Sequence, residues 1–274
     1  MPIPRFGKMT RHHSGIKESD ALSFGGGWLC CLCPRTTDDL TPERNSMIDP
    51  LAEAPDAPAQ VDCPACGEPQ DVTPVTVLQP GDPQLEELFR GKLNVVECQA
   101  CGQTFALQIP VVFRDDDSRT IIYYLPLDDQ SQVGEAEDQM VSLADRLFVG
   151  GDIEEEPICR LTTTTRAFIE KIALSVHGLD DRVIEYIKYQ LFTQLGSKID
   201  PVRTELLYDF STPLDDQLTL AMLDRETGAA QAGMQVPVAY YEELCATFAS
   251  GPAMEAEIED LFGSVYVTVD KLLS

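Results

Sequence analysis

CPACG at residues 63–67 and CQACG at residues 98–102 are the two stretches that decide the expected fold of this chain. In each motif two residues separate two cysteines, and a glycine follows the second cysteine. This spacing lets both sulfurs of one turn reach the same Zn²⁺ ion at about 2.3 Å, and the glycine lets the backbone turn back and present N–H groups to the sulfurs. The pair of motifs predicts a zinc-ribbon-like domain.

The cysteines of these motifs are the candidate metal ligands: Cys63, Cys66, Cys98 and Cys101. Zn²⁺ prefers four ligands in a tetrahedron, and a site closed by four thiolates leaves no position for water or substrate. We therefore expect one zinc ion with a structural role. Two other interpretations fit the same residues, namely four unrelated cysteines and two redox-active dithiols.

The residues around the motifs predict a zinc-ribbon-like antiparallel β domain over residues 61–127, with one short helix. Runs rich in β-branched residues predict its strands, Asp82 is a candidate N-cap for the helix, and Gly91 ends it. The expected strands are residues 71–78, 93–97, 104–113 and 120–125, and the expected helix is 83–90.

A second α+β domain is expected over residues 160–274, after an acidic connector at residues 128–159 that holds a short amphipathic helix near 135–147. An αα hairpin should open this domain, because threonines 162–165 can cap one helix and Asp180 and Asp181 can begin the next. The apolar stripe of the first helix has the spacing i, i+3, i+4, i+7 and consists of Ile169, Ile172, Ala173 and Val176.

A small sheet and a closing helix complete the expected second domain, so the expected fold class is α+β. The turn DRETG separates the second strand from the third, and its Gly228 can adopt a positive φ. The predicted strands are 204–210, 217–223, 231–236 and 264–269, and the predicted helix is 238–248.

The charge of the chain is strongly acidic, with 46 Asp and Glu against 20 Lys and Arg and a formal net charge of -26. Binding to nucleic acid needs a basic surface that neutralises phosphates, so we expect no nucleic-acid partner. An acidic surface repels anionic membranes and can attract basic proteins. No apolar run approaches the roughly 18 to 20 residues of a membrane-spanning helix, and we expect a cytoplasmic protein.

The N-terminal stretch differs from the remainder, because residues 1–46 hold six basic and five acidic residues and show no helical or strand periodicity. We expect residues 1–60 to be a disordered leader, in which residues 1–46 are an upstream extension and the working protein begins at Met47. A secretory signal needs about 7 to 15 consecutive apolar residues, and the run near Trp28 is shorter than that.

Other candidate residues have simpler explanations. A second candidate metal cluster near the N-terminus consists of Cys30, Cys31, Cys33, His12 and His13. We do not favour it, because adjacent cysteines point in different directions. Cys159 and Cys245 lie in apolar runs typical of core packing, and His177 falls at a helix end. The acidic residues 115–117 and 128–129 lack the spacing of a calcium loop. No set of catalytic residues is apparent.

The residues also resemble the CpXC domain proteins of bacteria, a family named for the motif that appears here as CPAC at residues 63–66. The resemblance continues through ELFRGKLNVVECQACG, VVFRDDDSRTIIYYLP and GLDDRVIEYIKY, and so covers most of residues 61–200. Gln99 stands where the family would have a second proline. The resemblance implies a zinc-binding domain and implies no reaction.

Two functions remain compatible with these observations. The first is a non-enzymatic interaction or adaptor protein, in which a structural zinc ion supports a surface that binds another protein. The second is a redox-responsive protein whose thiolates release zinc and form disulfides under oxidation.

Overall fold

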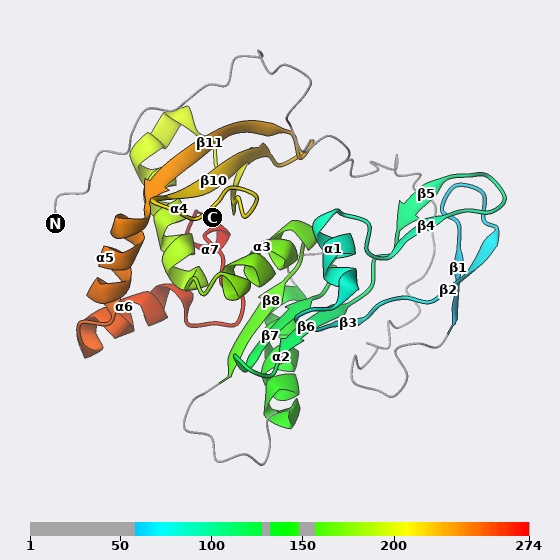
Figure 1. The fold of residues 1–274 in the computed structure, drawn as a ribbon, viewed down its shortest axis with the longest axis horizontal. Helices are drawn as coiled ribbons and strands as arrows, with labels where there is room; N and C mark the ends of the chain where they lie inside the picture. The colour runs from blue at the N-terminus through cyan, green and yellow to red at the C-terminus, as the bar shows by residue number, and fades with distance from the viewer. Residues whose placement is uncertain (1–57, 128–131, 148–156, 274) are drawn as a thin grey trace.

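The fold is described for residues 58–127, 132–147 and 157–273 of a computed structural model (Figure 1). It contains helices and several small sheets, which confirms the predicted α+β class. The proposed start at Met47, the cysteines near Trp28 and most of the expected leader lie outside the described residues. Within these ranges no helix combines the length and the hydropathy that a membrane span requires.

Two β-hairpins at one end of the molecule carry the cysteine motifs, and we call residues 58–72 and 95–106 together the hairpin arm (Figure 1). Both pairings are antiparallel, and the two hairpins form separate sheets. The strands are β1 (Ala59–Asp62), β2 (Pro69–Val72), β4 (Val95–Glu97) and β5 (Thr104–Ala106). Each cysteine motif therefore forms the tip of a hairpin.

A four-stranded mixed sheet forms the middle of the molecule in the order β3-β6-β7-β8. Its strands are β3 (Val77–Leu78), β6 (Val111–Asp115), β7 (Thr120–Tyr124) and β8 (Ile158–Thr162). All five residues of β7 are buried, because helices cover both faces of the sheet: α1 (Pro83–Phe89) and α3 (Thr165–Val176) on one face and α2 (Val133–Leu147) on the other. A strand covered on both faces reads as a continuous apolar run, as TIIYY does.

Several predicted strands differ from the observed ones. Residues 71–78 and 104–113 are each divided between two sheets, with Pro74 and Pro110 lying in the breaks, because proline cannot donate to a strand ladder. β8 was not predicted at all. It pairs in parallel with β7, so this sheet includes residues on both sides of the expected connector.

The predicted αα hairpin is confirmed and consists of α3 and α4 (Asp181–Leu195). The Thr164 hydroxyl accepts the N–H of Ala167, and the Asp180 carboxylate accepts the N–H of Arg182, so both helices have the side-chain caps expected of these residue types. The prediction that Val176 belongs to the buried stripe of α3 was wrong. Val176 is 61% exposed, because α3 reaches its last turn where the packing against the sheets has ended.

A three-stranded antiparallel sheet and four helical segments form the C-terminal part, around one large core. The strands are β9 (Thr204–Tyr208), β10 (Gln217–Asp224) and β11 (Ala230–Pro237). The helical segments are η2 (Gly196–Lys198), α5 (Val238–Phe248), α6 (Pro252–Phe262) and α7 (Asp270–Leu273). The strands and α5 were predicted, whereas α6 was not.

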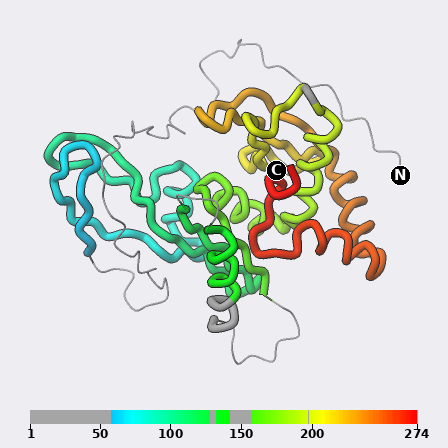
Figure 2. Tube along the Cα trace, turned by 180° about the vertical axis from the view of Figure 1, so that it is seen from behind, coloured from blue at the N-terminus to red at the C-terminus, as the bar shows by residue number. Residues whose placement is uncertain are grey.

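The C-terminal segment returns to the middle of the molecule after α6 (Figures 1 and 2). Residues 264–269 were predicted to be a strand, and this prediction was wrong because the segment joins no sheet. Its backbone groups instead make isolated hydrogen bonds. The carbonyl of Val265 accepts the N–H of Leu161 at 2.8 Å, and the N–H of Val269 donates to the Glu185 carboxylate at 2.8 Å.

Candidate metal centre

The two cysteine motifs fold into turns with the same hydrogen bonds. In the first turn the N–H of Gly67 donates to the carbonyl of Cys63 at 2.8 Å, and in the second the N–H of Gly102 donates to the carbonyl of Cys98 at 2.9 Å. Both glycines have positive φ values, 74° and 71°, a region in which residues with a Cβ are strained. The backbone reversal predicted at these glycines is therefore seen in both turns.

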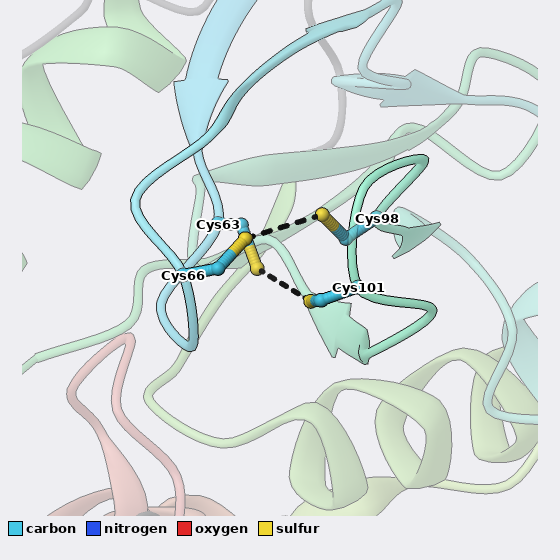
Figure 3. Close-up of side chains that lie close together, drawn as sticks. All are labelled: Cys63, Cys66, Cys98 and Cys101. Carbon is cyan, nitrogen blue, oxygen red and sulfur yellow. Dashed lines mark hydrogen bonds between the residues drawn. The ribbon is translucent and has the colours of Figure 1, made fainter.

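The four cysteine sulfurs come together between the hairpin tips, all within 4.8 Å of one another (Figure 3). The Sγ atoms of Cys63 and Cys101 are 3.8 Å apart, and those of Cys66 and Cys98 are 3.6 Å apart. A tetrahedron of sulfurs placed about 2.3 Å from a central ion has edges of about 3.8 Å. The arrangement is therefore compatible with a metal ion bound by four thiolates, and these residues could hold one.

Backbone N–H groups stabilise the thiolate form at one of these positions. The N–H groups of Cys101 and Ala100 lower the pKa of Cys98 to about 7 against the opposing effect of burial. The pKa of Cys66 is raised to about 12, because the N–H of Glu68 lowers it less than the adjacent thiols raise it. Four thiols this close cannot all ionise without a compensating cation, which is the condition that a bound metal ion supplies.

The two hairpins are also joined near their bases by Asn94, whose φ of 56° is one of two positive values for residues other than glycine in the described ranges. Its side-chain amide accepts the N–H of Val75 and donates to the carbonyl of the same residue, each at 2.8 Å. Asparagine tolerates this backbone region better than most residues. Asn94 thereby holds the chain before β4 against the chain after β2.

The other sequence candidates do not join the cysteine cluster. Cys159 is buried in the sheet core, and Cys245 is half-buried on α5. His177 follows the last residue of α3, and its Nδ1 lies 2.8 Å from the hydroxyl oxygen of Tyr208. The Asp115 carboxylate accepts the N–H groups of the turn that follows it. Residues 128–129 and the candidate cluster with His12 and His13 lie outside the described residues.

A buried network of charged side chains was missed by the sequence reasoning. It runs from β8 through the αα hairpin, and its members are Arg160, Asp181, Lys171, Glu185, Lys188 and Glu170. Lys188 is 2% exposed, and its Nζ lies 2.8 Å from carboxylate oxygens of both Glu170 and Glu185. Charged residues on helices usually face solvent, so nothing in the local pattern indicates this burial.

Mutual attraction within the network outweighs the cost of burial at several positions. Burial would raise the pKa of Asp181, but the charges of Lys171 and Arg160 hold it well below its usual range. Burial would lower the pKa of Lys188, but the carboxylates of Glu170 and Glu185 raise it. Backbone groups complete the network, since Glu170 accepts the N–H of Tyr208. The network therefore ties the middle sheet to the C-terminal part.

A cavity of about 550 Å³ lies beside this network. Eight charged side chains line it, and each has an oppositely charged partner within the chain: Glu170, Lys171, Glu185, Lys188, Glu205, Arg225, Asp270 and Lys271. These side chains therefore present no uncompensated charge to a bound molecule. Among the residues that the structure describes, the four cysteines are the group that points most clearly to one kind of ligand, a metal ion.

Comparison with known proteins identifies the domain that holds this site. No curated protein and no solved structure matches the chain significantly. The model of the family described as CpXC protein matches residues 61–188, a range that includes the four cysteines, the four-stranded sheet and the first half of α4. Residues 61–188 therefore match the CpXC family, as the resemblance of the motifs predicted.

Proposed function

We propose that the four cysteines bind one structural zinc ion, and that the zinc holds the hairpin arm as a surface for binding another protein. The observation that carries this proposal is the near absence of a core in the arm. Its buried residues are Cys63, Gln70 and Cys98. A unit with so little buried apolar surface gains its folding free energy from another source, and metal coordination by thiolates is such a source.

Zinc suits the donor set better than other common metal ions. Four thiolates in a tetrahedral arrangement favour Zn²⁺ or an iron–sulfur centre, and paired turns of the form C-x-x-C-G at two hairpin tips make a zinc-ribbon-like unit. Calcium and magnesium prefer oxygen ligands, which are absent from this cluster. A site closed by four sulfurs leaves no position for a reacting molecule, so a structural role follows from its chemistry.

The charge of the arm supports a basic protein surface as the partner. The arm contains no Lys or Arg, and its acidic residues are all exposed: Asp62, Glu68, Asp71 and Glu97. Acidic groups held on a rigid unit steer a basic partner and fix its orientation more than they add to affinity. The zinc ion would contribute by keeping these carboxylates in one arrangement.

Neutralising the four carboxylates of the arm tests this role. We expect a variant with Asp62→Asn, Glu68→Gln, Asp71→Asn and Glu97→Gln to keep its zinc but to capture its partner on the order of tenfold less well from native-cell extract. A matched control neutralises four exposed carboxylates elsewhere, Glu226, Glu242, Glu243 and Glu257, and should capture the partner normally. Equal capture by both variants, or no specific capture by the wild type, would contradict the interaction role.

The exposure of two cysteines favours one rival function. Cys66 and Cys101 are exposed, whereas Cys63 and Cys98 are buried. Exposed thiolates can be attacked by peroxide, so a redox-responsive site that loses zinc and forms disulfides is the alternative. The two functions differ in whether zinc leaves readily and reversibly under mild oxidation.

A further inference from the structure

Gln70 is a buried polar residue of the hairpin arm, and its side chain joins the two cysteine turns. It lies in β2 and is 5% exposed. Its Oε1 accepts the N–H of Gln99 at 2.9 Å, and its Nε2 donates to the carbonyls of Glu68 and Pro69 at 3.1 and 3.0 Å. Gln99 directly follows Cys98, so this side chain fixes the second turn from within the first hairpin.

We propose that Gln70 is a positioning residue for the metal centre, holding the two turns at the separation that brings four sulfurs around one ion. This inference rests on the proposed zinc site. β1 and β2 form one sheet and β4 and β5 another, so no strand ladder sets the distance between the hairpin tips. Hydrogen bonds beyond the ligands orient metal-binding groups and are commonly worth 10- to 100-fold in metal affinity.

The residue at position 99 makes this contact possible. Gln99 in the second turn corresponds to Pro64 in the first, and proline has no N–H to donate. Because the two turns have the same backbone hydrogen bonds, proline should fit at position 99 without disturbing the turn. A Gln99→Pro substitution therefore removes the donor to Gln70 and leaves the cysteines in place.

Three variants isolate the contact. We expect Gln70→Leu and Gln99→Pro each to weaken zinc binding on the order of tenfold. The double variant should bind zinc no more weakly than the weaker single variant, because both substitutions remove the same hydrogen bond. Gln99→Ala keeps the backbone N–H and should bind zinc as the wild type does.

The measurement is zinc affinity of the full chain by competition with a chelator of known affinity. The absorption spectrum with Co²⁺ at saturation is recorded alongside, and it should show the same tetrahedral thiolate bands in every variant, so that a loss of ligands is distinguished from a loss of positioning. Zinc affinities unchanged from the wild type, effects that multiply in the double variant, or weakened binding by Gln99→Ala would each overturn the role of Gln70. A wild-type chain that binds no zinc would instead overturn the proposed function.

Discussion

Cys98→Ser is expected to abolish metal binding and to unfold the hairpin arm, while the rest of the chain stays folded. Cys98 is 1% exposed, and its sulfur lies 3.6 Å from that of Cys66 in the centre of the cluster. Structural zinc contributes about 10 to 16 kcal/mol in small zinc-binding peptides, which far exceeds what the few buried residues of the arm can replace. None of the three hydrophobic core clusters in the described residues includes an arm residue, so those cores do not depend on the metal.

The experiment compares metal content and amide hydrogen exchange in the variant and the wild type. Amides of residues 58–72 and 95–106 should lose their protection in Cys98→Ser, whereas those of α3 and β10 should keep it. Cys245→Ser is the matched control, because this cysteine is half-buried on α5 and far in sequence from the cluster. Full zinc content in Cys98→Ser, or zinc loss in Cys245→Ser, would contradict the assigned ligand set.

Lys188→Met is expected to destabilise the folded chain by about 3 to 5 kcal/mol, because it leaves two buried carboxylates without the cation that they share. Glu170 and Glu185 are both 3% exposed, and neither can regain water without opening the core. Urea denaturation of the full chain measures the effect. Lys198→Met, at an exposed lysine in η2, should change stability by less than about 0.5 kcal/mol.

The dependence of stability on pH provides a second readout of the network. The pKa values of Asp181 and Glu185 are lowered in the folded chain, chiefly because the attraction of nearby lysines outweighs burial. Their stabilising contribution is therefore present above the unfolded pKa values near 4 and declines as the pH falls below them. Burial raises the pKa of Glu170, so this carboxylate becomes neutral early as the pH falls. The stability difference between the wild type and Lys188→Met should therefore become smaller on acidification. A loss of unfolding free energy in Lys188→Met that does not change with pH would contradict this account.

Local sequence patterns were sufficient to predict the cysteine turns and the αα hairpin. The spacing of the cysteines and the glycines that follow them specify the turns within five residues each. Thr164 and Asp180 cap their helices through contacts two or three residues away, which are visible in the sequence. The zinc identity, the ligand role of the cysteines and the domain boundaries stay predictions.

The features that the sequence did not predict depend on contacts between residues far apart in the chain. β8 is a short strand whose pattern is ambiguous, and it forms because β7 is available beside it. Residues 264–269 have strand-forming composition, but their backbone groups bond to the carboxylates of Glu137 and Glu185 and to the single N–H of Leu161 rather than to a strand ladder. α3 is packed against β7, β8 and β9, so even Glu170 and Lys171 are buried. Such burial depends on partners distant in sequence.

The zinc content of the wild-type chain tests the central claim most directly. Protein purified without added metal is treated with a chromogenic zinc indicator, first during titration with dilute peroxide and then after complete modification of its thiols. We predict no release at low peroxide and one zinc ion per chain after modification, because four thiolates close the site around a structural ion. Rapid release at low peroxide that reductant and zinc reverse would support the redox function instead, and no zinc at all would contradict the account.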